Sequence, residues 1–528
     1  MRVLVVEAIA PEGVAYLRER GFEVDELRKP TLEELHAALP SYEALVTRSG
    51  TAVTADLLAH APKLRIVGRA GVGVDNVDVD ACSRRGIVVV NAPYGNVVSA
   101  AEHTVGMLLA LVRRIPEAHE RLKALEWNRA IYGAELFRKK IGVVGLGKVG
   151  SRVAARLRGF EAEVLAYDPF IPETRARDVG ARLVGDFEEL LRTVDVVTVH
   201  VPLTPETDGM IGARELALMK RGVRVVNCAR GGIVHEAALL AALESGHVTG
   251  AAVDVWSEEP PTSETVRRLV QHPRVVVTPH LGANSSEAQV NVAVDVARQL
   301  VAFRDGDLVE HAVNIPVGDP GAVAELRPFV ALAERLGLFS VQLDPGHLER
   351  IDVRVAGAIA EGDTELLARA VLAGLLRPVM AGPINLVNAR LVARERGLEV
   401  TVEREEETGG YKSLITLCTR TAEGRKVIAG TVFDGQPRIV RMRDLDMEFT
   451  PEGYILVLSY EDRPGVVGKI GTLLGRLNVN IAAMQVGRRA KRGRAIVVLT
   501  LDEDLTPEQL AQLKADVEAD FARLVRLP

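Results

Sequence analysis

The sequence predicts an α/β protein with two doubly wound domains, followed by a smaller α+β domain and a terminal domain of ferredoxin-like βαββαβ order. Three observations lead to this prediction. Strand and helix signals alternate from the N-terminus, the alternation restarts after a long apolar helix near residue 97, and a different strand order follows residue 450. A chain of 528 residues is also too long for one compact core.

The composition is that of an ordinary soluble globular protein, with 48% hydrophobic residues, 26% charged residues and a net charge of −6. Residues 487–494 form the most basic stretch, which is typical of a solvated hairpin, and aromatic residues are sparse. Binding to nucleic acid is therefore not expected. Three scattered cysteines suggest no disulfide framework and no metal site, and they fit a reducing cytoplasm. An early charge at Glu7 and the lack of long apolar runs argue against a signal peptide and a membrane span.

The first domain is assigned to residues 1–96, where apolar strands alternate with amphipathic helices. Thr31 followed by Glu34 predicts a capping box at the start of one of these helices. Such alternation indicates a parallel sheet covered by helices on both faces. A helix over about 287–303 is expected to return to this domain, which residues 288–314 complete.

The second domain, residues 97–287, contains six predicted strands whose apolar runs do not alternate with polar residues. Strands of this kind are buried on both faces of a parallel sheet. Gly145, Gly147 and Gly150 form G-x-G-x-x-G between a strand and a helix. The first glycine permits a tight turn, the second lets a pyrophosphate approach the backbone, and the third lets helix and strand pack closely.

Asp168 ends the next strand, 18 residues after Gly150. A carboxylate at this place accepts hydrogen bonds from a ribose diol and repels a 2′-phosphate, so NAD is favoured over NADP. The alternative is that the glycines only pack a turn and Asp168 only caps a loop. His200 is expected at a strand end near the nucleotide, and His103 on a helix near the domain interface.

Three further residues follow strands of the same sheet, namely Arg230, Glu259 and His280. Ligands of open α/β sheets bind outside the carboxyl ends of the strands, so the three are expected to lie together. A histidine can take a hydroxyl proton, a carboxylate can orient its imidazole, and an arginine can grip a substrate carboxylate. Each residue alone could be structural, whereas their joint occurrence after the glycine motif favours oxidation of a 2-hydroxy acid.

These motifs, with the segments NCARGG, DVWSEEP and TPHLGA, resemble those of the D-2-hydroxyacid dehydrogenase family over roughly residues 1–315. The resemblance implies that Arg230 orients the substrate, Glu259 supports the histidine and His280 is the acid/base. His235 departs from the family, which usually has aspartate there, and it is expected on the following helix. The resemblance also implies a set of residues that contact NAD: Val72, Gly145, Gly147, Lys148, Val149, Gly150, Asp168, Val201, Cys228, Ala229, Asp254, Gly282 and Ala283.

Two arginine-bearing segments, TRSGT and GRAGVGVDN, are similar to those of family members that oxidise 3-phospho-D-glycerate. A substrate with a carboxylate and a phosphate needs more positive charge than a simple hydroxy acid. The substrate residues implied are Arg48, Ser49, Gly50 and Arg69. The alternative is that both arginines lie on the surface and bind nothing.

The C-terminal part strengthens this resemblance. Residues 315–449 are similar in position and length to the intervening domain of the long forms of these enzymes, and residues 450–528 look like an ACT domain. That module often binds amino acids at a dimer interface, although it could also serve dimerisation alone. The residues expected to hold L-serine are Tyr460, Asp462, Pro464, Gly465 and Asn480.

The resemblance as a whole implies NAD-dependent oxidation of 3-phospho-D-glycerate to 3-phosphohydroxypyruvate, the first step of serine biosynthesis, with feedback inhibition by L-serine. It also implies a homo-oligomer, a dimer or tetramer, in which the helix from Val97 and the segment through Trp127 contact another subunit. A glyoxylate or hydroxypyruvate reductase is the enzymatic alternative, and an NAD-sensing binding protein is the non-enzymatic one. The sequence leaves open the subunit number and the ligand, if any, of residues 315–449.

Overall fold

The computed structural model describes residues 1–316, 323–380, 382–422 and 424–528. Its first domain has a five-stranded parallel sheet in the order β2-β1-β3-β4-β5. The predicted capping box is present, because Thr31 Oγ1 accepts from the Glu34 amide and Glu34 accepts from the Thr31 amide. Its elements are β1 (Arg2–Val5), α1 (Pro11–Glu19), β2 (Glu23–Glu26), α2 (Leu32–Ala38), β3 (Ala44–Thr47), α3 (Ala55–Ala59), β4 (Ile66–Arg69), α4 (Val79–Arg84) and β5 (Val88–Asn91).

The helix expected to return to this domain is α13 (Ser286–Arg304), which packs on α1. The two helices approach so closely that a β-carbon on Gly13 would lie 2.8 Å from Ala293. A glycine is therefore required at this crossing.

The second domain has seven parallel strands in the order β12-β11-β10-β9-β6-β7-β8. The prediction of six strands was one short, because β8 has only two residues and gives no apolar run. The elements are α5 (Val97–Arg113), α6 (Ile115–Lys123), β6 (Lys140–Val144), α7 (Lys148–Arg158), β7 (Glu163–Tyr167), α8 (Glu173–Asp178), β8 (Arg182–Leu183), α9 (Phe187–Thr193), β9 (Val196–Val199), α10 (Ala213–Leu218), β10 (Val223–Asn227), α11 (Glu236–Glu244), β11 (Val248–Val253), α12 (Glu264–Val270) and β12 (Val275–Val277).

The third domain is a mixed six-stranded sheet, β14-β13-β15-β16-β17-β18, in which only the β13–β14 pair is parallel. Helices α14 and α15 cross at two glycines: a β-carbon on Gly337 or Gly374 would lie 2.1 or 2.0 Å from a carbonyl oxygen of the other helix. The elements are α14 (Val323–Leu343), β13 (Leu348–Gly357), α15 (Thr364–Leu376), α16 (Ala389–Glu395), β14 (Glu399–Glu405), β15 (Ser413–Thr421), β16 (Gly424–Phe433), β17 (Gln436–Met442) and β18 (Leu445–Phe449).

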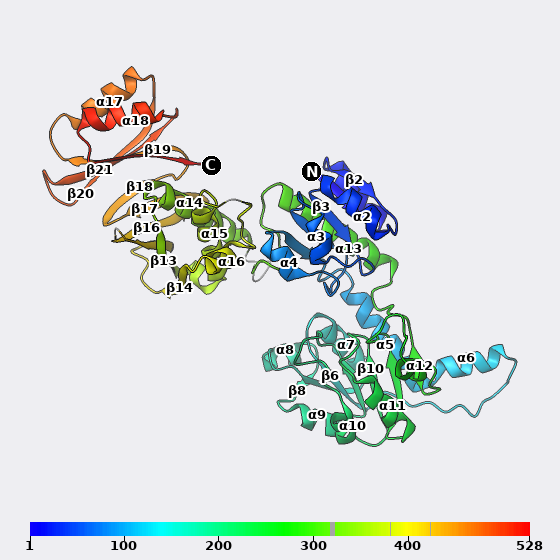
Figure 1. The fold of residues 1–528 in the computed structure, drawn as a ribbon. Helices are drawn as coiled ribbons and strands as arrows, with labels where there is room; N and C mark the ends of the chain where they lie inside the picture. The colour runs from blue at the N-terminus through cyan, green and yellow to red at the C-terminus, as the bar shows by residue number, and fades with distance from the viewer. Residues whose placement is uncertain (317–322, 381, 423) are drawn as a thin grey trace.

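The fourth domain confirms the predicted βαββαβ order, with an antiparallel sheet arranged β20-β21-β19-β22. One face of this sheet forms a core with its own helices, and the other face, with Ile455 and Val457, joins a core that includes Phe339 of α14. Figure 1 shows this domain stacked on the third. Its elements are β19 (Gly453–Glu461), α17 (Val466–Arg476), β20 (Ile481–Arg488), β21 (Arg494–Leu501), α18 (Pro507–Val517) and β22 (Phe521–Leu527).

We propose the boundaries 1–96, 97–287, 315–449 and 450–528 for these four domains, with residues 288–314 completing the first. Across the described residues, no helix has the length and apolar character needed to cross a membrane.

Candidate active site

The glycine turn joins β6 to α7, and each glycine has its own structural reason. Gly145 has φ +88°, a backbone conformation that favours glycine. A β-carbon on Gly150 would lie 2.0 Å from the Gly145 carbonyl oxygen, so that glycine lets helix and turn pack. Gly147, at the start of α7, has no atom within 4 Å of the place its β-carbon would take. The helix N-terminus is therefore open at the point where a pyrophosphate would approach the backbone amides.

Asp168 follows β7 and lies beside this turn. Its carboxylate accepts hydrogen bonds from the amide of Leu146, at 2.9 Å, and from the amide of Phe170, at 3.0 Å. The side chain therefore caps its loop, as the structural alternative expected, but the same bonds also fix the carboxylate next to the glycine turn. The residues around the turn fit a dinucleotide with an unmodified ribose.

His280 and Glu259 are paired, although 21 residues separate them. Nδ1 of His280 lies 2.8 Å and 3.1 Å from the two carboxylate oxygens of Glu259. An ionised carboxylate can only accept a hydrogen bond, so Nδ1 carries the proton and Nε2 keeps its lone pair. The imidazole is 44% exposed, which leaves Nε2 accessible to a substrate hydroxyl. Glu259 is held in turn by the amide of Trp256 at 3.1 Å.

Asp254 organises the segment that carries His280. Its side chain is buried and accepts from the amides of Leu281 and Gly282 at 2.7 and 2.9 Å, and from Thr278 Oγ1 at 2.5 Å. Nε2 of His103, on α5, lies 3.2 Å from the same carboxylate.

The protonation of Asp254 follows from these contacts. Burial alone would raise the pKa of the carboxyl, but the hydrogen bonds from His103, Thr278 and Leu281 outweigh it and lower the pKa below its ordinary value. Asp254 was expected only as an NAD contact, whereas in the structure it is buried and fixes the loop after β12.

Three arginines gather where the first domain faces the second. Burial, followed by the charge of Arg230 and a smaller effect of Arg48, lowers the pKa of Arg69. Nε of Arg69 is buried and has no hydrogen-bond partner among the described residues. Asp75 offsets part of this charge and pairs with Arg230 Nε at 3.3 Å across the two domains. The arrangement has an excess of positive charge, which favours an anionic ligand.

Glu7 is a residue of this site that the sequence analysis missed. Its carboxylate accepts from the amides of Arg48, Gly50 and Thr51 at 3.1, 3.1 and 2.9 Å, and from Thr47 Oγ1 at 3.0 Å. Burial tends to raise the pKa of Glu7, but these hydrogen bonds lower it overall. The carboxylate therefore fixes the loop that presents Arg48, Ser49 and Gly50.

The other residues expected near the nucleotide lie on α7 or on segments that follow strands of the two sheets. Lys148, on the first turn of α7, places Nζ 3.8 Å from the ring centroid of Tyr94 in the first domain. Cys228 is buried, which raises the pKa of its thiol to about 12 and makes it unreactive. Burial lowers the pKa of His200 to about 4, so that its ring is neutral. The remaining residues are Val72 after β4, Val149 on α7, Val201 after β9, Ala229 after β10, and Gly282 and Ala283 after β12.

The prediction that His235 lies on the helix was wrong by one residue. His235 precedes α11 and is its N-cap, with Nδ1 accepting from the Ala238 amide at 3.3 Å. Aspartate is also a strong N-cap, so the histidine takes over the capping role of the residue that the family usually carries there.

The fourth domain places the expected serine residues in two locations. Tyr460 belongs to β19, and its side chain lies in the core. The loop itself covers residues 462–465 and includes Pro464. Gly465 is the N-cap of α17 with φ +90°, which favours glycine.

Asp462 and Asn480 lie at opposite ends of α17, whose 11 residues span roughly 16 Å. Asp462 accepts from Arg488, and Asn480 Nδ2 donates to Asp502 Oδ2 at 2.6 Å. Hydrogen bonding to Arg488 lowers the pKa of Asp462. The two residues therefore do not meet within one chain.

Comparisons with known proteins agree with this geometry. Residues 105–282 match the family model of the D-isomer specific 2-hydroxyacid dehydrogenase, NAD binding domain; residues 325–443 match the D-3-phosphoglycerate dehydrogenase intervening domain; and residues 454–518 match the ACT domain. The chain is 43% identical to D-3-phosphoglycerate dehydrogenase of Archaeoglobus fulgidus, over 99% of this chain and 100% of the relative. It is 39% identical to the Bacillus subtilis protein of the same name over the full length of both.

Solved structures resemble part of the chain. The TT0316 protein of Thermus thermophilus is 32% identical with a TM-score of 0.55, over 59% of this chain and all of that one. A D-lactate dehydrogenase of Aquifex aeolicus complexed with NAD and lactic acid is 29% identical with a TM-score of 0.53, over 59% of this chain and 98% of that one.

The two glycines of the turn give a matched pair of variants. Gly150→Ala should lower the free energy of unfolding by about 1–3 kcal/mol, because its β-carbon would collide with the Gly145 carbonyl. Gly147→Ala should unfold like the wild type, since its β-carbon meets no atom, but should bind NAD more weakly. Denaturant unfolding and calorimetric titration with NAD measure both effects. Wild-type NAD affinity in Gly147→Ala would contradict this assignment.

Proposed function

Since the chain belongs to the D-3-phosphoglycerate dehydrogenase family of NAD-dependent 2-hydroxyacid dehydrogenases, we propose that it oxidises 3-phospho-D-glycerate to 3-phosphohydroxypyruvate. The observation that carries this proposal is the presence of two groups at one site: the cluster of Arg48, Arg69 and Arg230, and the His280–Glu259 pair. The two are linked because Gly231, next to Arg230, packs against Trp256, whose amide binds Glu259. The substrate carries two anionic groups and one hydroxyl that must lose its proton. The arrangement offers a cation for each anion and a base for the hydroxyl.

The amides at the start of α7 and Asp168 would hold NAD, which when bound would supply the acceptor for the hydride of the carbinol carbon. Nε2 of His280 takes the hydroxyl proton. Glu259 keeps the imidazole in the required tautomer and stabilises its protonated form. Arg230 grips the substrate carboxylate and polarises the oxygen of the product ketone.

The phosphate of the substrate is bound by Arg48 and Arg69, with the Ser49–Gly50 loop beside them. Glu7 holds this loop in place by accepting hydrogen bonds from its backbone amides. A substrate without a phosphate, such as glyoxylate, would leave this part of the cluster without a counter-charge. The geometry therefore favours phosphoglycerate over the smaller 2-oxoacids.

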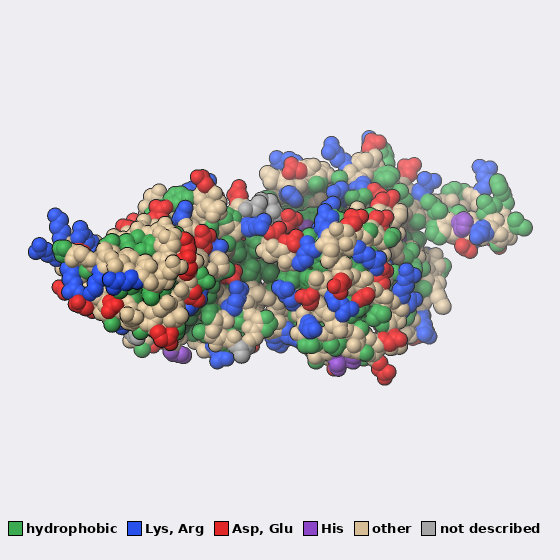
Figure 2. All heavy atoms as spheres, turned by 90° about the horizontal axis from the view of Figure 1, so that it is seen from above, with side chains coloured by type: hydrophobic (Ala, Val, Ile, Leu, Met, Phe, Trp, Pro, Cys, Tyr) green, Lys and Arg blue, Asp and Glu red, His purple; other side chains and the backbone are tan. Residues whose placement is uncertain are grey.

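The proposal includes a homo-oligomer. Helix α6 and the segment after it extend from the body of the protein, and apolar side chains cover much of this extension in Figure 2. Leu125, Trp127 and Tyr132 are 91%, 80% and 80% exposed. Large apolar side chains gathered in this way are typical of subunit interfaces. We also expect the enzyme to work in the cytoplasm, where its three free cysteines stay reduced.

Feedback inhibition by L-serine is the regulatory part of the proposal. Asp462 and the loop before α17 from one subunit would face Asn480 of another if the two-fold axis runs perpendicular to α17, because the two copies of the helix then lie antiparallel. The ammonium group of serine would then replace Arg488 as the partner of Asp462. The carboxylate of serine would accept hydrogen bonds from the backbone amides at the start of α17.

The acid/base assignment predicts a loss of turnover in His280→Ala. General acid–base catalysis contributes about 10²–10⁴-fold, so kcat should fall by that order while NAD affinity stays near that of the wild type. Stopped-flow NADH absorbance and NAD titration measure the two quantities. His347→Ala, an exposed histidine of the third domain, is the matched control and should keep full turnover. Near-normal turnover in His280→Ala would refute the assignment.

The arginine cluster predicts substrate selectivity. The wild type should produce NADH with 3-phospho-D-glycerate and consume far less NADH with glyoxylate. Arg69→Gln should lower kcat/KM for phosphoglycerate by roughly 10- to 100-fold, because each charge-assisted hydrogen bond contributes about 1.5–3 kcal/mol. Arg28→Gln, an exposed arginine of the same domain, is the control. An unchanged kcat/KM in Arg69→Gln would remove the phosphate-binding role.

Serine inhibition is tested on the full chain. Removing the fourth domain would expose the face of α14 that contains Phe339, so truncation alone gives an ambiguous result. Asp462→Ala and Asn480→Ala should each weaken inhibition by serine without changing uninhibited turnover, and Gln512→Ala on α18 should leave it intact. A coupling of about 1–3 kcal/mol corresponds to a 5- to 150-fold change in apparent affinity. If millimolar serine neither bound nor slowed the wild type, the regulatory proposal would fail while the dehydrogenase activity stood.

A further inference from the structure

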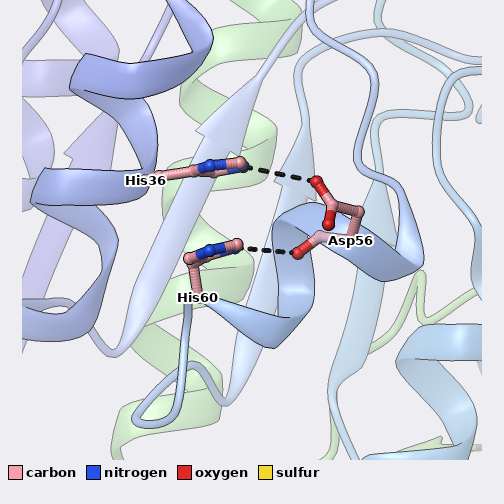
Figure 3. Close-up of side chains that lie close together, drawn as sticks. All are labelled: His36, Asp56 and His60. Carbon is pink, nitrogen blue, oxygen red and sulfur yellow. Dashed lines mark hydrogen bonds and ion pairs between the residues drawn. The ribbon is translucent and has the colours of Figure 1, made fainter.

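Two histidines and an aspartate form a cluster in the first domain, on helices that none of the proposed chemistry uses. His36 comes from α2, and Asp56 and His60 come from α3 and its C-cap. The imidazole rings are stacked, with centroids 3.8 Å apart and planes 9° from parallel. Figure 3 shows both rings directed toward Asp56. The nearest ligand-type atoms of the three side chains all lie within 4.8 Å of one another.

The nitrogen of His36 that faces this cluster has no hydrogen bond. Nε2 is buried, and within the described part of the chain it finds no hydrogen-bond partner. Asp56 Oδ2 lies 3.6 Å away, which is beyond hydrogen-bonding distance. A buried polar atom without a partner costs free energy. A ligand from outside the protein would remove this cost by bonding to the nitrogen.

His60 is oriented by a contact of a different kind. Its Nδ1 lies 3.1 Å from the backbone carbonyl of Asp56, one helical turn earlier. A carbonyl oxygen only accepts, so Nδ1 carries the proton and Nε2 keeps a lone pair. Metal-binding histidines usually donate their other ring N–H to a carbonyl or carboxylate in this way, which fixes the tautomer and the ring orientation.

We propose that His36, Asp56 and His60 bind a divalent transition-metal ion of the zinc type. Two imidazoles and one carboxylate are ligands that zinc prefers, and three protein ligands leave a fourth position open to water. Ligand atoms lie about 2.0–2.2 Å from bound zinc, and an imidazole binds an ion in its own ring plane. The stacked rings must therefore tilt out of their parallel arrangement, and the three groups must draw together, before all three can bind one ion. Asp56 is 71% exposed and is free to turn toward the ion.

The ion would link α2 to α3, two helices on the same face of the first sheet. Helix α3 begins shortly after the Arg48–Thr51 loop, and Thr54 caps it. Holding α3 against α2 would therefore stabilise the end of the segment that carries this loop. The inference does not rest on the proposed function, because the cluster lies apart from the arginines and from His280.

Calorimetric titration of the purified full-length protein with ZnCl₂, after treatment with a chelator, tests the proposal. The wild type should bind one equivalent per chain at this site, and Zn²⁺ should raise its melting temperature. Replacing a direct ligand should cost at least as much as replacing a group that only orients one. His36→Ala and His60→Ala should therefore weaken binding by roughly tenfold or more. Asp56→Asn should also weaken it.

Co²⁺ provides a second measurement, because visible absorption bands report a low-coordinate site with imidazole ligands. These bands should appear in the wild type and be lost in His36→Ala and His60→Ala. His347→Ala, remote from the cluster, is the control for binding to surface histidines. Circular dichroism of each variant checks that it is folded. No saturable Zn²⁺ binding by the wild type, or equal binding by the folded His36→Ala and His60→Ala variants, would overturn the proposal.

Discussion

The buried carboxylate of Asp254 holds the candidate catalytic machinery in place. An ionised group without solvent is costly unless hydrogen bonds surround it, and Asp254 obtains them from Thr278, Leu281, Gly282 and His103. Its own backbone carbonyl accepts the amide of His280 at 2.8 Å. The loop cannot change without breaking these bonds, which explains how His280 is kept at φ +56°. One residue thus joins the base, its loop and the helix that leads from the first domain.

Much of this architecture could be predicted because its signals are local. The apolar strands and the spacing of Gly145, Gly147 and Gly150 are visible in short windows of sequence. That Arg230, Glu259 and His280 end on one edge follows from topology, because parallel strands all place their carboxyl ends on the same side of a sheet. Their common edge is why Glu259 can reach Nδ1 of His280.

Contacts between distant segments could not be predicted in this way. Glu7 follows the first strand and gives no sign in the sequence that it accepts amides from residues 48–51. Its role arises only because β1 and β3 are neighbours in the sheet. The same holds for His36 and His60, which are brought together by helix packing and have no metal-binding spacing. The motif around Tyr460 was clear, but it did not show that the tyrosine side chain lies in the core of the fourth domain.

The packing of the domains limits how an effector at the C-terminus could reach the active site. One apolar cluster runs through the first, third and fourth domains, in addition to a separate core in the first and in the fourth, whereas the apolar clusters of the second domain do not join it. Polar contacts reinforce the first group: Arg369 donates to the carbonyl of Asn314 at 3.3 Å, and the side chain of Asn314 binds the backbone at Val89 and Ile87. Because cores resist deformation, these three domains should move as one body. An effector would therefore act by turning this body, with Arg48 and Arg69, relative to the domain that carries His280.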